Sequence, residues 1–142
     1  HGYLGWGKST PLGSGLGLIM GAKLAKPDWL AVNIMGDAAF GMVGMDFETA
    51  VRNNIPIMTV LLNNRVMGGY SKKQAKATEL YGINRLSGDY AKVAEGLGGY
   101  VEHVEKIADL KPAFQRAIAA TENGRAAFVE VMTCEDQTLP GV

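Results

Sequence analysis

Two groups of polar residues follow two apolar segments in a pattern that suits metal and phosphate chemistry. Gly36 and Asp37 come directly after the apolar segment 30–35, and Asn63 and Asn64 come directly after the segment 57–62. If the two segments form adjacent parallel strands, their carboxyl ends meet at one sheet edge, about 5 Å apart. A carboxylate, an amide oxygen and a backbone carbonyl are ligands that Mg²⁺ or Ca²⁺ accepts, with phosphate or water completing the shell of Mg²⁺. The sequence therefore predicts a metal-bridged phosphate site.

A purely structural role for these residues is the competing interpretation. Asp37 would cap the helix that follows it, and Asn63 and Asn64 would form a turn, because Asp and Asn are common at such positions. The small side chains of Ala38 and Ala39 suit the functional interpretation, because they let backbone N–H groups approach a phosphate. Residue spacing alone leaves both interpretations open.

A second candidate phosphate site lies near the beginning of the sequence. Residues 2–9, Gly-Tyr-Leu-Gly-Trp-Gly-Lys-Ser, satisfy the P-loop pattern, in which Lys8 and Ser9 would meet phosphate and magnesium. That pattern has this meaning only between a strand and a helix, whereas a single residue precedes it and Pro11 follows it closely. The glycines of 13–21 also suggest a dinucleotide fingerprint, but the preceding strand is missing. We expect these glycines to let a helix pack closely against the sheet.

The elements that must position these groups alternate between strands and helices. The segments 30–35 and 57–62 are typical of strands buried on both faces, and 45–53 between them has helical spacing. Further along, the pattern predicts a helix that is capped by Asp89 and ends at Gly98-Gly99, followed by a short strand at 100–101. It then predicts a helix that is capped by Asp109, has Pro112 in its first turn and ends at 123–124. A last strand is predicted at 127–132. The long segment 63–87 shows no strong periodicity and is expected to be a loop. The alternation predicts one α/β domain over 1–142, with helices on both faces of a mostly parallel sheet.

Composition excludes several classes of partner. The 142 residues carry 14 basic and 14 acidic side chains, without the basic excess that is usual for a nucleic-acid binder. No apolar run reaches the length of about 18 residues that suggests a membrane span, and no signal-peptide pattern is present. The single cysteine, Cys134, permits no internal disulfide. We therefore expect a soluble cytoplasmic protein that binds neither nucleic acid nor membrane.

The chain resembles the cofactor-binding domain of thiamine diphosphate enzymes of the acetolactate synthase, pyruvate oxidase and oxalyl-CoA decarboxylase group. The motif of that family is Gly-Asp-Gly, a spacer in the mid-twenties and Asn-Asn, matched here from Gly36-Asp37-Ala38 to Asn63-Asn64 with Ala38 in place of the third glycine. Further segments that look like family blocks lie at 13–21, 26–28, 39–42, 44–49, 54–56 and 98–101. The segments within 39–49 look most like the oxalyl-CoA decarboxylase and 2-hydroxyacyl-CoA lyase branch. The resemblance covers nearly the whole chain and implies a three-layer α/β/α thiamine diphosphate-binding fold.

Carried over position by position, the resemblance implies a set of site residues. Mg²⁺ would be held by Asp37, the side-chain oxygen of Asn64 and the backbone carbonyl of Val66. The resemblance also implies that Gly36 and the amides of Ala38 and Ala39 contact the diphosphate. The carbonyl of Thr10 would accept a hydrogen bond from the exocyclic amine, and Leu12 would hold the cofactor in its bent form. Met67 and Gly68 would line the far side of the cofactor. The continuation 65–67 departs from the commoner glycine-rich one, so the substrate-facing loop is left open.

The resemblance also implies the type of reaction and the need for a second domain. It implies decarboxylation or carboligation of 2-oxo acids, or cleavage of 2-hydroxyacyl-CoA or oxalyl-CoA. In the family a glutamate from a pyrimidine-binding domain, normally in a neighbouring subunit, activates the cofactor, and no segment here resembles that domain. We therefore expect half of an active site that is inactive alone, either as a fragment of a larger enzyme or as a small subunit, in a homo- or hetero-oligomer. A non-catalytic interaction or regulatory domain of the same fold is the alternative, and a P-loop NTPase is a remote one.

Overall fold

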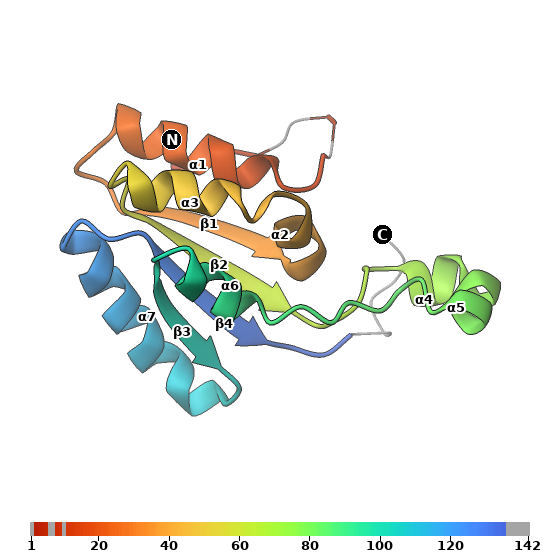
Figure 1. Ribbon diagram of the computed structural model, residues 1–142. Helices are drawn as coiled ribbons and strands as arrows, with labels where there is room; N and C mark the ends of the chain where they lie inside the picture. The colour runs from red at the N-terminus through yellow and green to blue at the C-terminus, as the bar shows by residue number, and fades with distance from the viewer. Residues whose placement is uncertain (1, 6–7, 10, 136–142) are drawn as a thin grey trace.

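The computed structural model describes residues 2–5, 8–9 and 11–135, and its centre is a parallel β-sheet (Figure 1). In the described part of the chain the sheet has four strands in the order β1-β2-β4-β3. The strands are β1 (Ala31–Gly36), β2 (Ile57–Asn63), β3 (Tyr100–Val104) and β4 (Ala127–Met132). Every neighbouring pair is parallel, as expected when helical crossovers connect successive strands. The predicted strands are confirmed, and the third continues to Val104.

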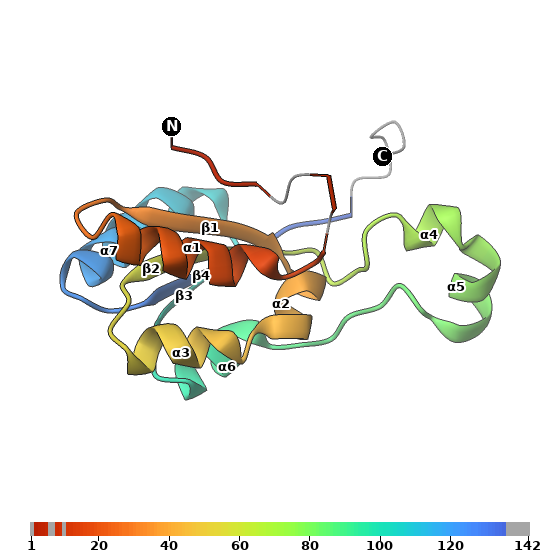
Figure 2. The same cartoon turned by 90° about the horizontal axis from the view of Figure 1, so that it is seen from above.

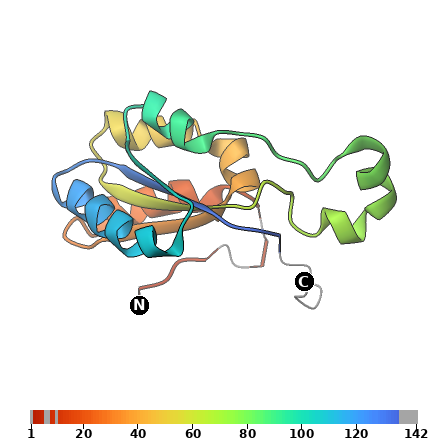
Figure 3. The same ribbon diagram turned by 90° about the horizontal axis from the view of Figure 1, so that it is seen from below.

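Helices cover both faces of this sheet, which confirms the three-layer α/β/α prediction. One face packs against α1 (Ser14–Ala25), α2 (Asp37–Val43), α3 (Asp46–Arg52) and α6 (Tyr90–Gly96). The other face packs against α7 (Ile107–Glu122). Figures 2 and 3 show α3 and α6 on one side of the strands and α7 on the other. Among the described helices, none has both the length and the apolar character that a bilayer crossing requires.

An aromatic cluster fills the core beneath α2, α3 and α6. The ring centroids of Phe40 and Phe128 lie 4.8 Å apart, and those of Phe47 and Phe128 lie 5.7 Å apart with planes inclined at 68°. Tyr90 meets Phe40 edge-on at 5.7 Å. Such tilted and edge-to-face pairs are favourable geometries for aromatic rings. This packing fixes α2, and with it Asp37, against the carboxyl end of the sheet.

The start of α1 lies close to β1 and α2. Gly13 has φ +92°, and a Cβ there would lie 2.6 Å from the side chain of Val43. A Cβ at Gly15 would lie 2.6 Å from Oδ1 of Asn33 on β1, which confirms close helix–sheet packing at this glycine. At Gly17 a Cβ would meet open space, so the same explanation does not extend along the whole helix. Lys8 lies well before the first helical residue, so the described residues do not form the strand–loop–helix geometry of a P-loop.

Residues 63–87 are not the structureless loop that the sequence pattern predicts. They contain α4 (Tyr70–Lys73) and α5 (Ala75–Tyr81), which form an arm that extends beyond the carboxyl ends of the strands (Figure 1). The residues of α5 are mostly good helix formers. Neither helix has a fully buried residue, and this explains the lack of a core-facing apolar period in the sequence.

The predicted helix caps are confirmed at α6 and corrected at α7. The side chain of Asp89 accepts a hydrogen bond from the backbone N–H of Lys92, as an N-cap does. Helix α7 begins at Ile107, so Asp109 lies inside its first turn rather than at the cap, and Pro112 lies beyond that turn. Asp109 still suits its position, because the positive end of the helix dipole favours an acidic side chain there.

Candidate functional site

The carboxyl ends of β1 and β2 bring the two predicted polar groups together. The strands are adjacent and parallel, and Gly36 is paired in register with Leu62. Asp37 is the first residue of α2, while Asn63 is the last residue of β2. Both groups therefore lie at the sheet edge where open α/β folds bind ligands.

Asp37 is a buried acid at the start of α2. Asp37 is only 3% exposed. Oδ1 accepts from the N–H of Ala38 at 2.9 Å, and Oδ2 accepts from the N–H of Arg65 at 2.8 Å. Within the described ranges, no Lys, Arg or His forms an ion pair with it. Since a carboxylate offers about four acceptor positions, two remain for a further ligand, and a cation would supply the missing opposite charge.

The turn after β2 is tied directly to Asp37. The N–H of Arg65 is shared between Asp37 Oδ2 at 2.8 Å and Asn63 Oδ1 at 3.0 Å. Asn64 Oδ1 accepts from the N–H of Val66 at 3.1 Å. The two asparagines thus form the turn that the structural interpretation predicts, and the same turn carries Asn64 to the edge that the functional interpretation requires. The other part of the structural interpretation is wrong, because the N-cap of α2 is Gly36, which makes no side-chain cap bond, and Asp37 is the first helical residue.

The backbone after this turn is clamped at the base of the arm. Val66 forms an isolated antiparallel bridge with Arg85. The N–H of Met67 donates to the carbonyl of Asn84 at 2.7 Å. A Cβ at Gly68 would meet open space, so this side of the turn leaves room beside the main chain. The predicted positions 66–68 therefore lie on a fixed segment next to the sheet edge.

The remaining predicted contacts lie at the starts of α2 and α1. Gly36 precedes α2 in an extended conformation, and the N–H groups of the first helical turn have no partner within the helix. The N–H of Ala38 already donates to Asp37, whereas Ala39 is buried in the same turn. Leu12 is 49% exposed just before α1. Thr10 lies outside the described residues.

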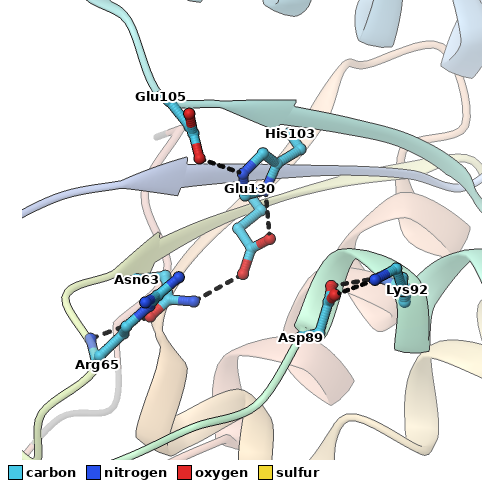
Figure 4. A network of polar contacts seen from close by, with 7 residues as sticks. All are labelled: Asn63, Arg65, Asp89, Lys92, His103, Glu105 and Glu130. Carbon is cyan, nitrogen blue, oxygen red and sulfur yellow. Dashed lines mark hydrogen bonds and ion pairs between the residues drawn. The ribbon is translucent and has the colours of Figure 1, made fainter.

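A network that the sequence reasoning missed lies beside the turn (Figure 4). Glu130 on β4 is 1% exposed and accepts from Asn63 Nδ2 at 2.7 Å, while its other oxygen lies 2.7 Å from Nδ1 of His103 on β3. The hydrogen bond to Glu130, aided by a weaker one to Glu105, raises the pKa of His103. A cavity of about 370 Å³ borders Asn63, Arg65, His103 and Glu130. In the sequence, the sign of this network is Glu130 itself, a single acid in the otherwise apolar segment 127–132.

Tyr90 is a second residue that the sequence reasoning did not identify. Its pKa is raised first by burial and then by the negative charges of Asp37 and Glu130. A Cβ at Gly41 would lie 3.3 Å from its hydroxyl oxygen. Tyr90 is therefore close enough to feel the charges of both Asp37 and Glu130, and its ring packs edge-on against Phe40.

The site offers too few protein groups to fill the coordination shell of a metal ion, so it suits a metal whose shell is completed by a bound phosphate ligand. The described ranges contain no group of three or more His, Cys, Asp or Glu side chains arranged as a metal site. The site instead offers one carboxylate, one amide oxygen and one carbonyl. Mg²⁺ commonly takes few ligands from the protein when phosphate oxygens and water complete its octahedron. The residues present therefore fit a metal-bound diphosphate.

Comparison with solved structures gives the same fold in a known enzyme. The chain matches the thiamine diphosphate-dependent 4-hydroxybenzoylformate decarboxylase of Rhodococcus jostii RHA1 with a TM-score of 0.77 and 31% sequence identity. The match covers 89% of this chain and 24% of that enzyme.

Curated relatives are enzymes of the same kind. The chain is 40% identical to the acetolactate synthase large subunit of Mycobacterium tuberculosis, over 95% of this chain and 25% of that protein. It is 33% identical to a 2-hydroxyacyl-CoA lyase of Oryza sativa, over 81% of this chain and 21% of that protein. The chain thus spans about a quarter of the length of these relatives. The family model described as the thiamine pyrophosphate enzyme C-terminal TPP-binding domain matches residues 1–131, and the chain belongs to this family.

Proposed function

We propose that this chain anchors the diphosphate of thiamine diphosphate through Mg²⁺ held by Asp37, the side-chain oxygen of Asn64 and the carbonyl of Val66. The observation that carries the proposal is the buried carboxyl of Asp37, which has no basic partner among the described residues. This carboxyl and the side-chain oxygen of Asn63 both accept from the N–H of Arg65 in the turn after β2. A divalent cation would balance this charge, and the diphosphate would complete its shell.

The residues around this metal position would hold the rest of the cofactor. The first turn of α2, including the amides of Ala38 and Ala39 next to Gly36, would donate to diphosphate oxygens. Met67 and Gly68 would line the far side of the cofactor, where the backbone leaves open space. The carbonyl of Thr10 would accept from its exocyclic amine.

The reaction we propose is decarboxylation or carboligation of 2-oxo acids, or cleavage of 2-hydroxyacyl-CoA or oxalyl-CoA. When bound, thiamine diphosphate supplies carbanion chemistry at a carbonyl carbon, which protein side chains lack. The named activities of the relatives, acetolactate synthase and 2-hydroxyacyl-CoA lyase, support this range of substrates. The contribution of this chain is to bind and orient the cofactor, because Asp37 and the turn after β2 are fixed by the sheet.

We further propose that the active site needs a pyrimidine-binding domain with its activating glutamate. The chain spans about a quarter of the relatives, so most of their length lies outside the segment that it matches. This half-site would work in a homo- or hetero-oligomer, and the chain by itself would be inactive.

Leu12 offers a test of how the roles are divided within the half-site. We propose that its exposed side chain supports the bend of the cofactor and does not touch the metal. In the assembled enzyme, which includes the pyrimidine-binding domain, Leu12→Ala is then expected to lower kcat and to leave the magnesium-dependent Kd for thiamine diphosphate within about threefold of wild type. Steady-state kinetics and calorimetry measure the two quantities, and an equal loss of affinity would contradict this division.

Calorimetric titration of the intact protein with thiamine diphosphate and with ATP, each with and without Mg²⁺, tests the proposed function. Magnesium-dependent binding of thiamine diphosphate alone supports it. Binding of ATP alone would favour the P-loop alternative at Lys8 and Ser9. Binding of neither by the intact protein would favour a non-catalytic domain that keeps the fold.

A further inference from the structure

A chain of hydrogen bonds joins β3 and β4 to the turn after β2. His103 and Glu130 are partners in register, and His103 Nδ1 lies 2.7 Å from Glu130 Oε2 (Figure 4). Glu130 Oε1 accepts from Asn63 Nδ2 at 2.7 Å, and Asn63 Oδ1 accepts from the N–H of Arg65 at 3.0 Å. The chain thus ends on the same N–H that donates to Asp37 Oδ2 at 2.8 Å.

Packing alone does not account for a glutamate at this position. Glu130 is 1% exposed on a strand whose other residues are apolar, and Phe128 on the same strand belongs to the aromatic core. An apolar residue of similar size would fill the space without the desolvation penalty of a carboxyl group. Both carboxyl oxygens of Glu130 are instead used, one by Asn63 and one by His103.

The turn at the end of this hydrogen-bond chain contains a residue, Arg65, in an unfavourable backbone conformation. Arg65 has φ +60°, a left-handed conformation that residues with a side chain seldom adopt. Such conformations persist when surrounding contacts hold them. Here the N–H of Arg65 is held by Asn63 and Asp37 together, and Asn63 is in turn held by Glu130.

We propose that Glu130 is a positioning residue for the cofactor site. Through Asn63 it holds the turn at Arg65 closed, so that the oxygen of Asn64 and the carbonyl of Val66 are arranged before the metal arrives. This inference rests on the proposed function, because it assigns Glu130 to the same site. Glu130 itself touches neither metal nor cofactor. When Glu130 is lost, the turn samples other conformations, and apparent cofactor affinity falls with the fraction of molecules whose turn is closed.

Three variants of the intact protein test this role. Glu130→Leu removes both hydrogen bonds and keeps a similar volume. Glu130→Gln keeps an oxygen that can accept from Asn63 and adds an N–H that can donate to His103 Nδ1. Glu102→Leu is the control, because it removes another carboxyl of the sheet, which pairs with Arg116 at 2.7 Å and, among the described residues, forms no hydrogen bond to the turn.

Two readouts separate positioning from a general loss of stability. Hydrogen exchange of the backbone amides in 62–68, measured without cofactor, reports how often the turn opens. Calorimetry with thiamine diphosphate and Mg²⁺ reports the Kd. For Glu130→Leu we expect faster exchange in this segment and a Kd raised by about tenfold to hundredfold, the range seen when supporting residues of metal sites are removed. Glu130→Gln is expected to restore most of both values, and Glu102→Leu to change neither.

The outcomes distinguish this inference from the proposed function. A folded Glu130→Leu protein with unchanged exchange and unchanged Kd would overturn the positioning role, as would equal effects in Glu102→Leu. If Glu130→Leu does not fold, Asn63→Asp takes its place, since it keeps the acceptor for Arg65 and replaces the donor to Glu130 by an oxygen; faster exchange in 62–68 supports the role and unchanged exchange overturns it. A wild-type protein that binds no cofactor would contradict the proposed function, while the exchange comparison still decides whether Glu130 holds the turn.

Discussion

Asp37→Asn separates the role of a metal ligand from that of a helix-start residue. Asn has nearly the same shape as Asp and is an equally good residue at a helix start, but it carries no charge. In the structure the carboxyl group accepts from the N–H groups of Ala38 and Arg65. Asn provides one oxygen and one NH₂ group, so one of these two N–H groups would face a donor, at a cost of about 1–3 kcal/mol.

The same substitution removes a buried charge that has no basic partner among the described residues. Because burying an unpaired charge costs several kcal/mol, its removal offsets the lost hydrogen bond. We therefore expect the free energy of unfolding of the protein without metal to stay within about 2 kcal/mol of wild type. This near-neutral effect on stability contrasts with the expected effect on binding.

Cofactor affinity is expected to fall by more than about a hundredfold, or ~2.7 kcal/mol, in Asp37→Asn. Loss of a residue that only supports a metal ligand costs about tenfold to hundredfold in metal affinity, and Asp37 would supply the only charged protein ligand in the proposed set. At a cofactor concentration about 100 times its Kd, wild type should gain ~2.7 kcal/mol of stability from binding, and the variant should gain far less.

Calorimetry and thermal unfolding with and without thiamine diphosphate and Mg²⁺ measure both effects on the intact protein. Asp46→Asn is the matched control, since Asp46 lies exposed in the first turn of α3 and has the same position relative to its helix. It should bind the cofactor like wild type. If Asp37→Asn keeps its magnesium-dependent affinity within about threefold of wild type, Asp37 organises the turn only and the metal assignment is refuted.

Two further predictions concern stability. A Cβ at Gly15 would lie 2.6 Å from Asn33 Oδ1, so Gly15→Ala is expected to lower the free energy of unfolding by about 1–3 kcal/mol, whereas Gly17→Ala, where the space is open, should raise it by about 0.5–1 kcal/mol. Urea unfolding measures both, and equal effects would contradict the close packing. The hydrogen bond to Glu130 raises the pKa of His103, so its contribution to stability is fully present below about pH 6.5 and is lost as pH rises through the folded-state pKa. Unfolding in a pH series should show stability falling over this range in wild type and less so in His103→Gln; a wild-type stability that rises there would refute the linkage.

The parts of the fold that follow from local pattern could be predicted from the sequence. The apolar segments 30–35 and 57–62 became β1 and β2, and their adjacency follows from the rule that a helix connects neighbouring parallel strands. The meeting of Asp37 with the turn after β2 is a consequence of that rule. Errors arose where local signals were weak: α7 begins at Ile107 after Lys106, which has no capping side-chain bond, so Asp109 was the stronger local candidate for the cap.

The support behind the turn could not be predicted in the same way, because it depends on strand order. Glu130 and Asn63 are 67 positions apart in the chain, and they meet only because β4, the last strand along the described chain, inserts between β2 and β3. The same insertion places His103 opposite Glu130. A lone acid in an apolar strand is a sign that a partner is needed, since a buried carboxyl must be hydrogen-bonded, but the sequence analysis did not use this sign. The partner could be named only after the sheet order was known, and for this reason a residue on the last strand emerges as the support of a turn that follows the second.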